Sequence, residues 1–214
     1  MPSQQTSKQN QARSSTIATY LQRQVATRDE LPRFLIVCEG EKTEPRYFEA
    51  LAAELHLSVN VRIEGLGDNT DSLVERAVEL KNEKEAYYAQ AWCVFDRDSF
   101  PANRFNRAIQ VAQGNGLFVA YSNEAFELWY ILHFEYLQAG LHRDDYKTKL
   151  TKCLGKRYEK NSVTMYRELK LKQSTAIRHA IKLLLACDPP NPEQDNPSTT
   201  VHLLVQELNK FRRE

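Results

Sequence analysis

The sequence of 214 residues lacks closely paired cysteines and long apolar runs, and each absence excludes a class of protein. Its four cysteines are widely spaced and form neither a CxxC pair nor a Cys/His pair. We therefore expect reduced, mostly buried thiols rather than disulfides or a zinc site. No apolar run reaches the roughly 18 residues of a membrane-spanning helix. These absences predict a cytoplasmic protein with no membrane partner.

Net charge is also nearly absent, because 29 Lys and Arg residues face 28 Asp and Glu residues, which leaves +1. A global basic surface, by which many nucleic-acid-binding proteins are recognised, is thus excluded, and any polyanion site must be a local patch. The first residues contain no apolar segment typical of a secretory signal. Residues 1–30 are rich in Gln, Ser, Thr and Arg, which predicts a flexible N-terminal arm.

Short apolar runs alternate with segments of helical periodicity from Phe34 onward. Continuous apolar runs at residues 34–38, 91–95 and 117–121 predict strands buried on both faces, and alternation at 59–63 predicts a half-buried or edge strand. Helical patterns separate these strands. This order predicts an α/β fold with a mostly parallel sheet flanked by helices.

The second half of the chain is expected to be helical. Residues 122–137 are apolar nearly all round, which predicts one long buried helix. Further helical patterns occupy residues 138–214 and predict a C-terminal helical extension, whose last helix is capped by Ser198 or Thr199. The predicted organisation is therefore an arm at 1–30, an α/β domain at 31–137 and an extension at 138–214.

Acidic residues follow two of the buried strands at the point where each strand ends. Glu39 and Glu41 come after the first run, and Asp96 and Asp98 follow the run at 91–95. Because open α/β sheets place their ligands at the carboxyl ends of the strands, these side chains can converge. Two carboxylates about 4 Å apart repel by roughly 4 kcal/mol. Such a cluster needs a proton or a cation, and oxygen ligands without His or Cys favour Mg²⁺ or Mn²⁺.

A divalent ion held there can orient a phosphodiester and activate water. Glu41 or Glu127 is then a candidate for a further ligand or base. Glu127 qualifies because a carboxylate on a buried helix must be paired, protonated or bound to metal. Lys42 and Arg97, which lie beside the acidic residues, are candidate phosphate contacts.

Glu39 after one strand and the Asp96-Arg97-Asp98 triplet after a later one resemble the TOPRIM pattern of a Glu and a DxD. That resemblance implies a metal-dependent nuclease or nucleotidyl-transfer fold, TOPRIM-like, with Glu39, Asp96 and Asp98 as metal ligands. A second, longer resemblance rests on five segments: EGEKTEPRYF, VFDRDSF, SNEAFELWYILHF, YEK at 158–160 and NPSTTVHLLVQEL. Because Lys160 belongs to one of these segments, it is a further candidate phosphate contact.

Together these segments, which extend over nearly the whole chain from Phe34, resemble the RloB family. The resemblance implies a TOPRIM-like effector of bacterial defence against phage, often encoded beside an AAA or ABC-type ATPase. The leading hypothesis is a Mg²⁺- or Mn²⁺-dependent nuclease acting on RNA, with tRNA among the candidates, or on DNA. Nucleotidyl transfer and a non-catalytic regulatory or scaffolding subunit of an ATPase complex stay open, as does a homo-oligomer.

Structural explanations stand beside these functional ones. Acidic residues after strands commonly cap helices or turns, Glu127 can form an ion pair, and Lys160 can be a surface residue. Glu44, next to Pro45, is expected only as a favourable charge at a helix start. Capping, however, explains acidic residues one at a time, whereas a metal site explains several that follow separate buried strands.

Overall fold

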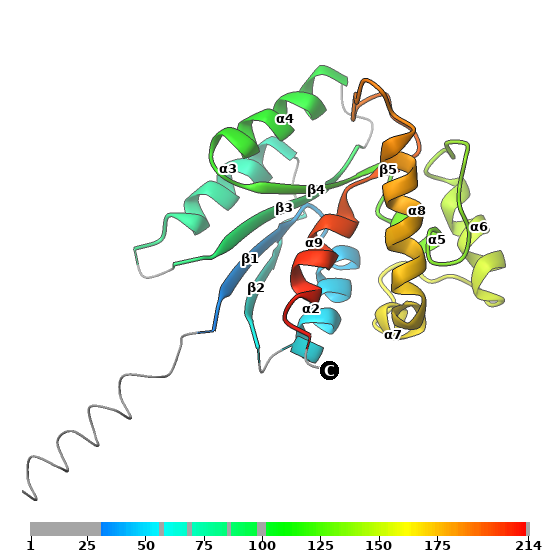
Figure 1. Ribbon diagram of the computed structural model, residues 1–214, viewed down its shortest axis with the longest axis horizontal. Coiled ribbons are helices and arrows are strands. Elements are labelled where there is room, and N and C mark those ends of the chain that lie inside the picture. The colour runs from blue at the N-terminus through cyan, green and yellow to red at the C-terminus, as the bar shows by residue number, and fades with distance from the viewer. Residues whose placement is uncertain (1–30, 56–57, 68–69, 85–86, 98–101, 213–214) are drawn as a thin grey trace, which may run out of the picture. The chain divides into compact units, whose positions relative to one another are not determined.

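The computed structural model describes residues 31–55, 58–67, 70–84, 87–97 and 102–212. The predicted arm at 1–30 and the predicted metal ligand Asp98 lie outside the described residues. From Pro32 onward the chain forms one compact unit. In it a five-stranded sheet is flanked by helices, which confirms the predicted fold class (Figure 1).

The strand order in the sheet is β2-β1-β3-β4-β5. The strands are β1 (Arg33–Cys38), β2 (Asn60–Gly65), β3 (Gln90–Asp96), β4 (Phe118–Asn123) and β5 (Ser198–Thr199). The first four are parallel, with β1 between β2 and β3, and β5 pairs antiparallel with β4. Cys38 lies opposite Val94 in the register, so β1 and β3 end at the same edge of the sheet.

Helices cover both faces because successive residues of a buried strand point to opposite sides. Leu35 and Val37 of β1 pack in one core cluster with residues of α3 (Thr70–Lys81) and α4 (Ala102–Gly114). Phe34 and Ile36 pack in the other cluster, which holds most of the remaining helices. These are α2 (Thr43–Leu55), α5 (Glu127–Ile131), α6 (Asp145–Leu154), α7 (Met165–Leu169), α8 (Gln173–Leu185) and α9 (Val201–Asn209).

The long helix predicted for residues 122–137 is wrong. β4 continues to Asn123, and α5 begins only at Glu127 and ends at Ile131. Ser122 pairs with Thr199 and Asn123 with Ser198, and the hydroxyls of Ser122 and Thr199 lie 3.1 Å apart. Tertiary pairing with a distant strand thus extends β4 into a segment whose local pattern favours helix. The apolar residues that follow are buried because they lie inside the core.

Residues after 137 supply a strand as well as helices. Ser198 and Thr199, expected to cap the last helix, form β5, and α9 begins at Val201 after the N-cap residue Thr200. The hydroxyl of Thr199 still accepts a hydrogen bond from the Val201 N–H at 3.2 Å. The C-terminal helices share the core cluster that contains α2 and α5.

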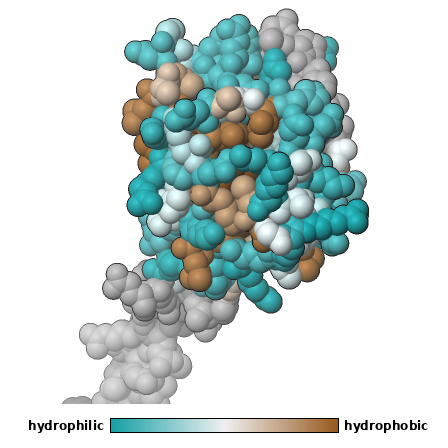
Figure 2. All heavy atoms as spheres, turned by 90° about the vertical axis from the view of Figure 1, so that its right-hand side faces the viewer, coloured by the Kyte–Doolittle hydropathy of each residue, from teal (hydrophilic) through white to brown (hydrophobic). Residues whose placement is uncertain are grey.

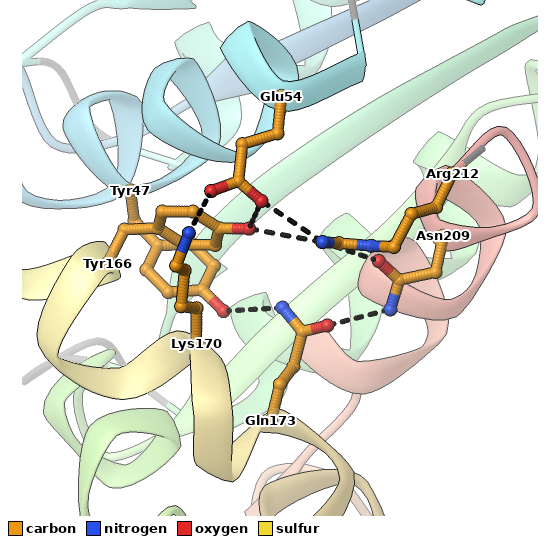
Figure 3. A network of polar contacts seen from close by, with 7 residues as sticks. All are labelled: Tyr47, Glu54, Tyr166, Lys170, Gln173, Asn209 and Arg212. Atoms are coloured by element: carbon orange, nitrogen blue, oxygen red, sulfur yellow. Dashed lines mark hydrogen bonds and ion pairs between the residues drawn. The ribbon is translucent and has the colours of Figure 1, made fainter. Parts of the chain in front are cut away.

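A polar network joins these helices to α2 (Figure 3). Glu54 accepts hydrogen bonds from Lys170 at 2.7 Å, from the Tyr166 hydroxyl at 3.0 Å and from Arg212 at 3.0 Å. In the same network Gln173 bridges Asn209, at 2.7 Å, and Tyr47, at 3.4 Å. We call these seven residues the α2 network; it links α2 to α7, α8 and the end of the chain.

The four cysteines are free, with Cys38 and Cys93 buried and Cys153 and Cys187 half-buried. Among the described helices, none has the length and apolar character needed to cross a membrane. 

Candidate active site at the carboxyl edge of the sheet

The ends of β1 and β3 bring Glu39 and Asp96 together. The Glu39 N–H donates to the Val94 carbonyl at 2.9 Å, which continues the pairing of the two strands beyond Cys38. Glu39 Oε2 accepts from the Asp96 N–H at 3.0 Å, and Oε1 accepts from the Thr70 hydroxyl at 3.2 Å. Convergence of these two acidic residues follows directly from parallel strands that end at one edge.

The two carboxylate oxygens of Asp96 have different surroundings. Oδ2 accepts from the Phe126 N–H at 3.0 Å, whereas Oδ1 is buried and has no hydrogen-bond partner among the residues that the structure describes. Burial, followed by the charges of Glu44, Glu127 and Glu39, raises the pKa of Asp96 well above its ordinary value. A buried acceptor without a donor is costly, so this oxygen is where a proton or a cation would bind.

Glu44 is a member of this cluster that the sequence reasoning missed. It lies in the first turn of α2 and is only 6% exposed. Burial, with the charges of Glu127 and Glu39, raises the pKa of Glu44 to about 7, against an opposing effect of Lys160. A Cβ atom at Gly40 would collide with the Glu44 carboxylate, so the glycine leaves the space that this side chain occupies.

Glu127, in the first turn of α5, is a further buried carboxylate at the strand ends. It is 8% exposed, and its Oε1 accepts a hydrogen bond from the buried Tyr158 hydroxyl at 3.0 Å. Its charge contributes to the raised pKa values of both Asp96 and Glu44, which places it within electrostatic reach of each. Glu127 was predicted at the site because it belongs to a buried apolar segment, and in the structure it lines the same pocket as Glu39 and Asp96.

The four carboxylates line a pocket of about 390 Å³, which we call the acidic pocket. Three cations also line it. They are Lys42, Arg143 and Lys160. Glu41 lines the pocket too, but it is exposed, and its side chain lies over Gly67, which has a left-handed φ of +65°.

Two predicted phosphate contacts, Lys42 and Lys160, thus lie at the pocket, whereas Arg97 is not among its lining residues. Arg143 was missed, and no local pattern around it could have identified it, since only the folded C-terminal segment brings it to the sheet edge.

The chemical type of the candidate ligand atoms suits a hard divalent cation. All candidate ligands are carboxylate oxygens, which Mg²⁺ and Mn²⁺ prefer. The buried Asp96 Oδ1 has no hydrogen-bond partner within the described part of the chain. Within the described ranges, however, no group of three His, Cys, Asp or Glu residues is arranged closely enough to hold an ion. Asp98, the third ligand predicted beside Glu39 and Asp96, is outside those ranges.

Fold and site together define an α/β protein with an acidic pocket, bordered by cations, at the carboxyl edge of a mostly parallel sheet. Residues 34–208 match the protein family described as RloB-like protein, and the chain belongs to that family. Comparisons with curated proteins and with solved structures gave no match.

Proposed function

We propose that this protein is a Mg²⁺- or Mn²⁺-dependent, TOPRIM-like nuclease that hydrolyses phosphodiester bonds of RNA, with tRNA among the candidates, or of DNA. One observation carries the proposal: carboxylates from separate segments converge in one pocket that three exposed cations border. Helix capping accounts for acidic residues singly and gives no reason for four of them to share a pocket.

In this proposal Glu39, Asp96 and Asp98 hold the metal ion. When bound, the ion supplies positive charge that orients the phosphodiester and lowers the pKa of the attacking water. Thr70 and the Asp96 N–H fix the Glu39 carboxylate by hydrogen bonds, so one ligand is already oriented before an ion binds. The Phe126 N–H does the same for Asp96.

Glu44 and Glu127 are the candidates for proton transfer or further ligation, since both are buried and lie at the pocket. Glu41, at the exposed side, has the same chemical capacity in a solvated position. Lys42 and Lys160 are proposed to contact phosphate oxygens of the substrate.

Family membership supports a role as an effector in anti-phage defence, with an AAA or ABC-type ATPase as a candidate partner and a homo-oligomer as a candidate assembly. We place this activity in the cytoplasm. Free thiols at all four cysteines are consistent with a reducing compartment.

The test is cleavage of labelled tRNA, unstructured RNA and DNA in Mg²⁺ or Mn²⁺, by the chain alone and together with a candidate ATPase partner. Wild type is compared with Asp96→Asn and with the control Glu75→Gln, which alters an exposed acid on α3 outside the acidic pocket. Metal-dependent cleavage lost only in Asp96→Asn supports the nuclease. Absence of cleavage under all these conditions overturns it, and incorporation of labelled nucleotide favours nucleotidyl transfer.

A second candidate is a non-catalytic binding subunit of an ATPase complex. Two observations favour it: no three-ligand group is arranged for a metal in the described ranges, and large apolar side chains are exposed in the C-terminal region. Figure 2 shows brown apolar surface among hydrophilic residues on one face, and the exposed residues of this region include Val163, Leu171 and Leu185. Calorimetry separates the candidates, because this one predicts tight ATPase binding without Mn²⁺ binding.

A further inference from the structure

One wall of the acidic pocket includes Lys160 and Asn161, which lie far along the chain from the strand ends. The Tyr158 hydroxyl donates to Glu127, at 3.0 Å. The Thr43 hydroxyl donates to Asn161 Oδ1 at 2.7 Å, and Arg46 donates to the Asn161 carbonyl. Asn161 adopts a φ of +69°, a left-handed conformation that Asn tolerates better than most residues. These bonds fasten the wall to α2 and α5.

The most buried carboxylates and the cations of the pocket lie at different depths. Glu44 and Glu127 are 6% and 8% exposed, and Asp96 Oδ1 is buried, so these three carboxylates form the floor. Glu39 is half-buried, and Glu41 is exposed. Lys42 and Lys160 are exposed, as is Arg143, so the cations form the rim. A phosphodiester must therefore pass the rim to reach the floor.

This depth discriminates between forms of nucleic acid. A duplex is stiff on the scale of a protein pocket and keeps its phosphates on a convex surface. A single strand can bend locally, and enzymes that act inside narrow pockets use single strands or nucleotides taken out of the duplex.

The lining residues that the structure describes offer no exposed aromatic face for bases. Among the described residues that line the pocket, Phe126 is the only aromatic one, and it is 1% exposed. Recognition of unpaired bases relies on exposed aromatic faces on which the bases stack. Cations at the rim instead match the sugar-phosphate backbone, which carries no sequence information.

We propose that the acidic pocket takes single-stranded nucleic acid by its backbone. A phosphodiester bends past Lys42, Arg143 and Lys160 to the carboxylate floor while the bases stay outside, so an intact duplex is excluded and base sequence matters little. This inference rests on the proposed nuclease function and names its substrate class.

The test uses one set of oligonucleotides in Mn²⁺: a single strand, a hairpin with an unpaired loop and a fully paired duplex. We expect the single strand and the loop to be cleaved at least about tenfold faster than the duplex. A second single strand of unrelated sequence should be cleaved at a rate within about threefold. Equal cleavage of the duplex, or strong dependence on base sequence, overturns the inference and leaves the nuclease proposal standing.

Binding decides the inference independently of cleavage. In Ca²⁺, which takes the same oxygen ligands, fluorescence anisotropy should show about tenfold tighter binding of the single strand than of the duplex. Lys160→Glu should weaken binding of the single strand, whereas the control Lys152→Glu, an exposed lysine of α6 outside the pocket, should not. If nothing is cleaved, the nuclease proposal fails; if single strand and duplex bind equally, or neither binds, the substrate inference fails.

Discussion

Glu44 and Glu54 lie in the first and last turns of α2, yet their surroundings are opposite. The pKa of Glu54 lies below its ordinary value (Figure 3). Partial burial acts to raise this pKa, but the hydrogen bonds from Lys170, Tyr166 and Arg212 have the larger, opposite effect. Burial raises the pKa of Glu44 to about 7, and the neighbouring charges of Glu127 and Glu39 add to the effect.

The contrast separates a carboxylate whose charge is stabilised by hydrogen bonds from one whose ionisation its surroundings oppose. The α2 network gives Glu54 donors that stabilise its charge, and thereby holds the C-terminal helices on α2. At the acidic pocket, burial and like charges oppose ionisation, which is costly for folding and typical of sites that bind cations or transfer protons. Substitutions at the two ends of α2 should therefore divide between loss of activity and loss of stability.

Asp96→Asn should have the largest effect. The amide keeps an oxygen that can accept from the Phe126 N–H but removes the negative charge, so metal-dependent cleavage should fall by about 100-fold or more. The free energy of unfolding should not decrease, since Asn avoids the cost of a buried charge. Initial rates in Mn²⁺ and urea unfolding measure the two effects. A variant with wild-type rates would remove Asp96 from the site.

Glu44→Gln should change the dependence of stability on pH. With no divalent ion present, the native state keeps a proton on Glu44 up to about pH 7, whereas the unfolded state releases it near the ordinary value of 4.5. Stability should therefore fall by about 3 kcal/mol as pH rises from 4.5 to beyond 7. Glutamine has no such proton, so this part of the decline should disappear.

Urea unfolding of both proteins in EDTA at pH 5, 6, 7 and 8 measures that difference. Asp96, whose pKa is raised partly by the charge of Glu44, contributes a decline in both proteins, so the difference reports Glu44 together with its effect on Asp96. We expect the variant to be the more stable protein at pH 8. Parallel stability profiles would contradict the buried, protonated state of Glu44.

Glu54→Gln tests the opposite end of the helix. Loss of charge-assisted hydrogen bonds from Lys170 and Arg212 should lower the free energy of unfolding at pH 7 by about 1–2 kcal/mol, while cleavage stays unchanged. Because the pKa of Glu54 is lowered, its contribution is present above pH 4.5 and is lost as pH falls through the lowered native value. The two proteins should therefore become similar in stability in acid.

The matched control for this prediction is Glu79→Gln, in an exposed ion pair with Arg76 on α3. Its effect should stay within about 0.5 kcal/mol. If Glu79→Gln destabilises the protein as much as Glu54→Gln does, the α2 network has no special part in holding the C-terminal helices.

The local sequence pattern was sufficient to predict which residues lie at the ends of the strands that form the site. Apolar runs mark β1 and β3, and parallel strands necessarily bring Glu39 and Asp96 to one edge. Glu44 was also within reach of this reasoning. It lies at helical spacing from Phe48 and Leu51, which are buried, so it belongs to the buried face of α2 rather than to a solvated helix start.

Contacts between distant segments were beyond that reasoning. Ser122 and Asn123 extend β4 because they pair with β5, which lies about 75 residues later in the chain. The same holds for Arg143 and Asn161, which reach the pocket only through the packing of the C-terminal segment. Periodicity describes one element at a time and carries no information about which distant segment completes it.

Lys42 and Lys170 offer the smallest and most selective test of the contrast between the two ends of α2. Lys42 lies at the acidic pocket, so Lys42→Ala should weaken binding of a single strand by about threefold to tenfold. The slope of the logarithm of the binding constant against the logarithm of the salt concentration should become shallower by about 1. Lys170 pairs with Glu54 at 2.7 Å on a partly exposed surface, so Lys170→Ala should cost about 0.5 kcal/mol of stability and leave binding unchanged. Anisotropy titrations at several salt concentrations and urea unfolding of both variants measure this. If either variant impairs both properties, the two ends of α2 do not work independently.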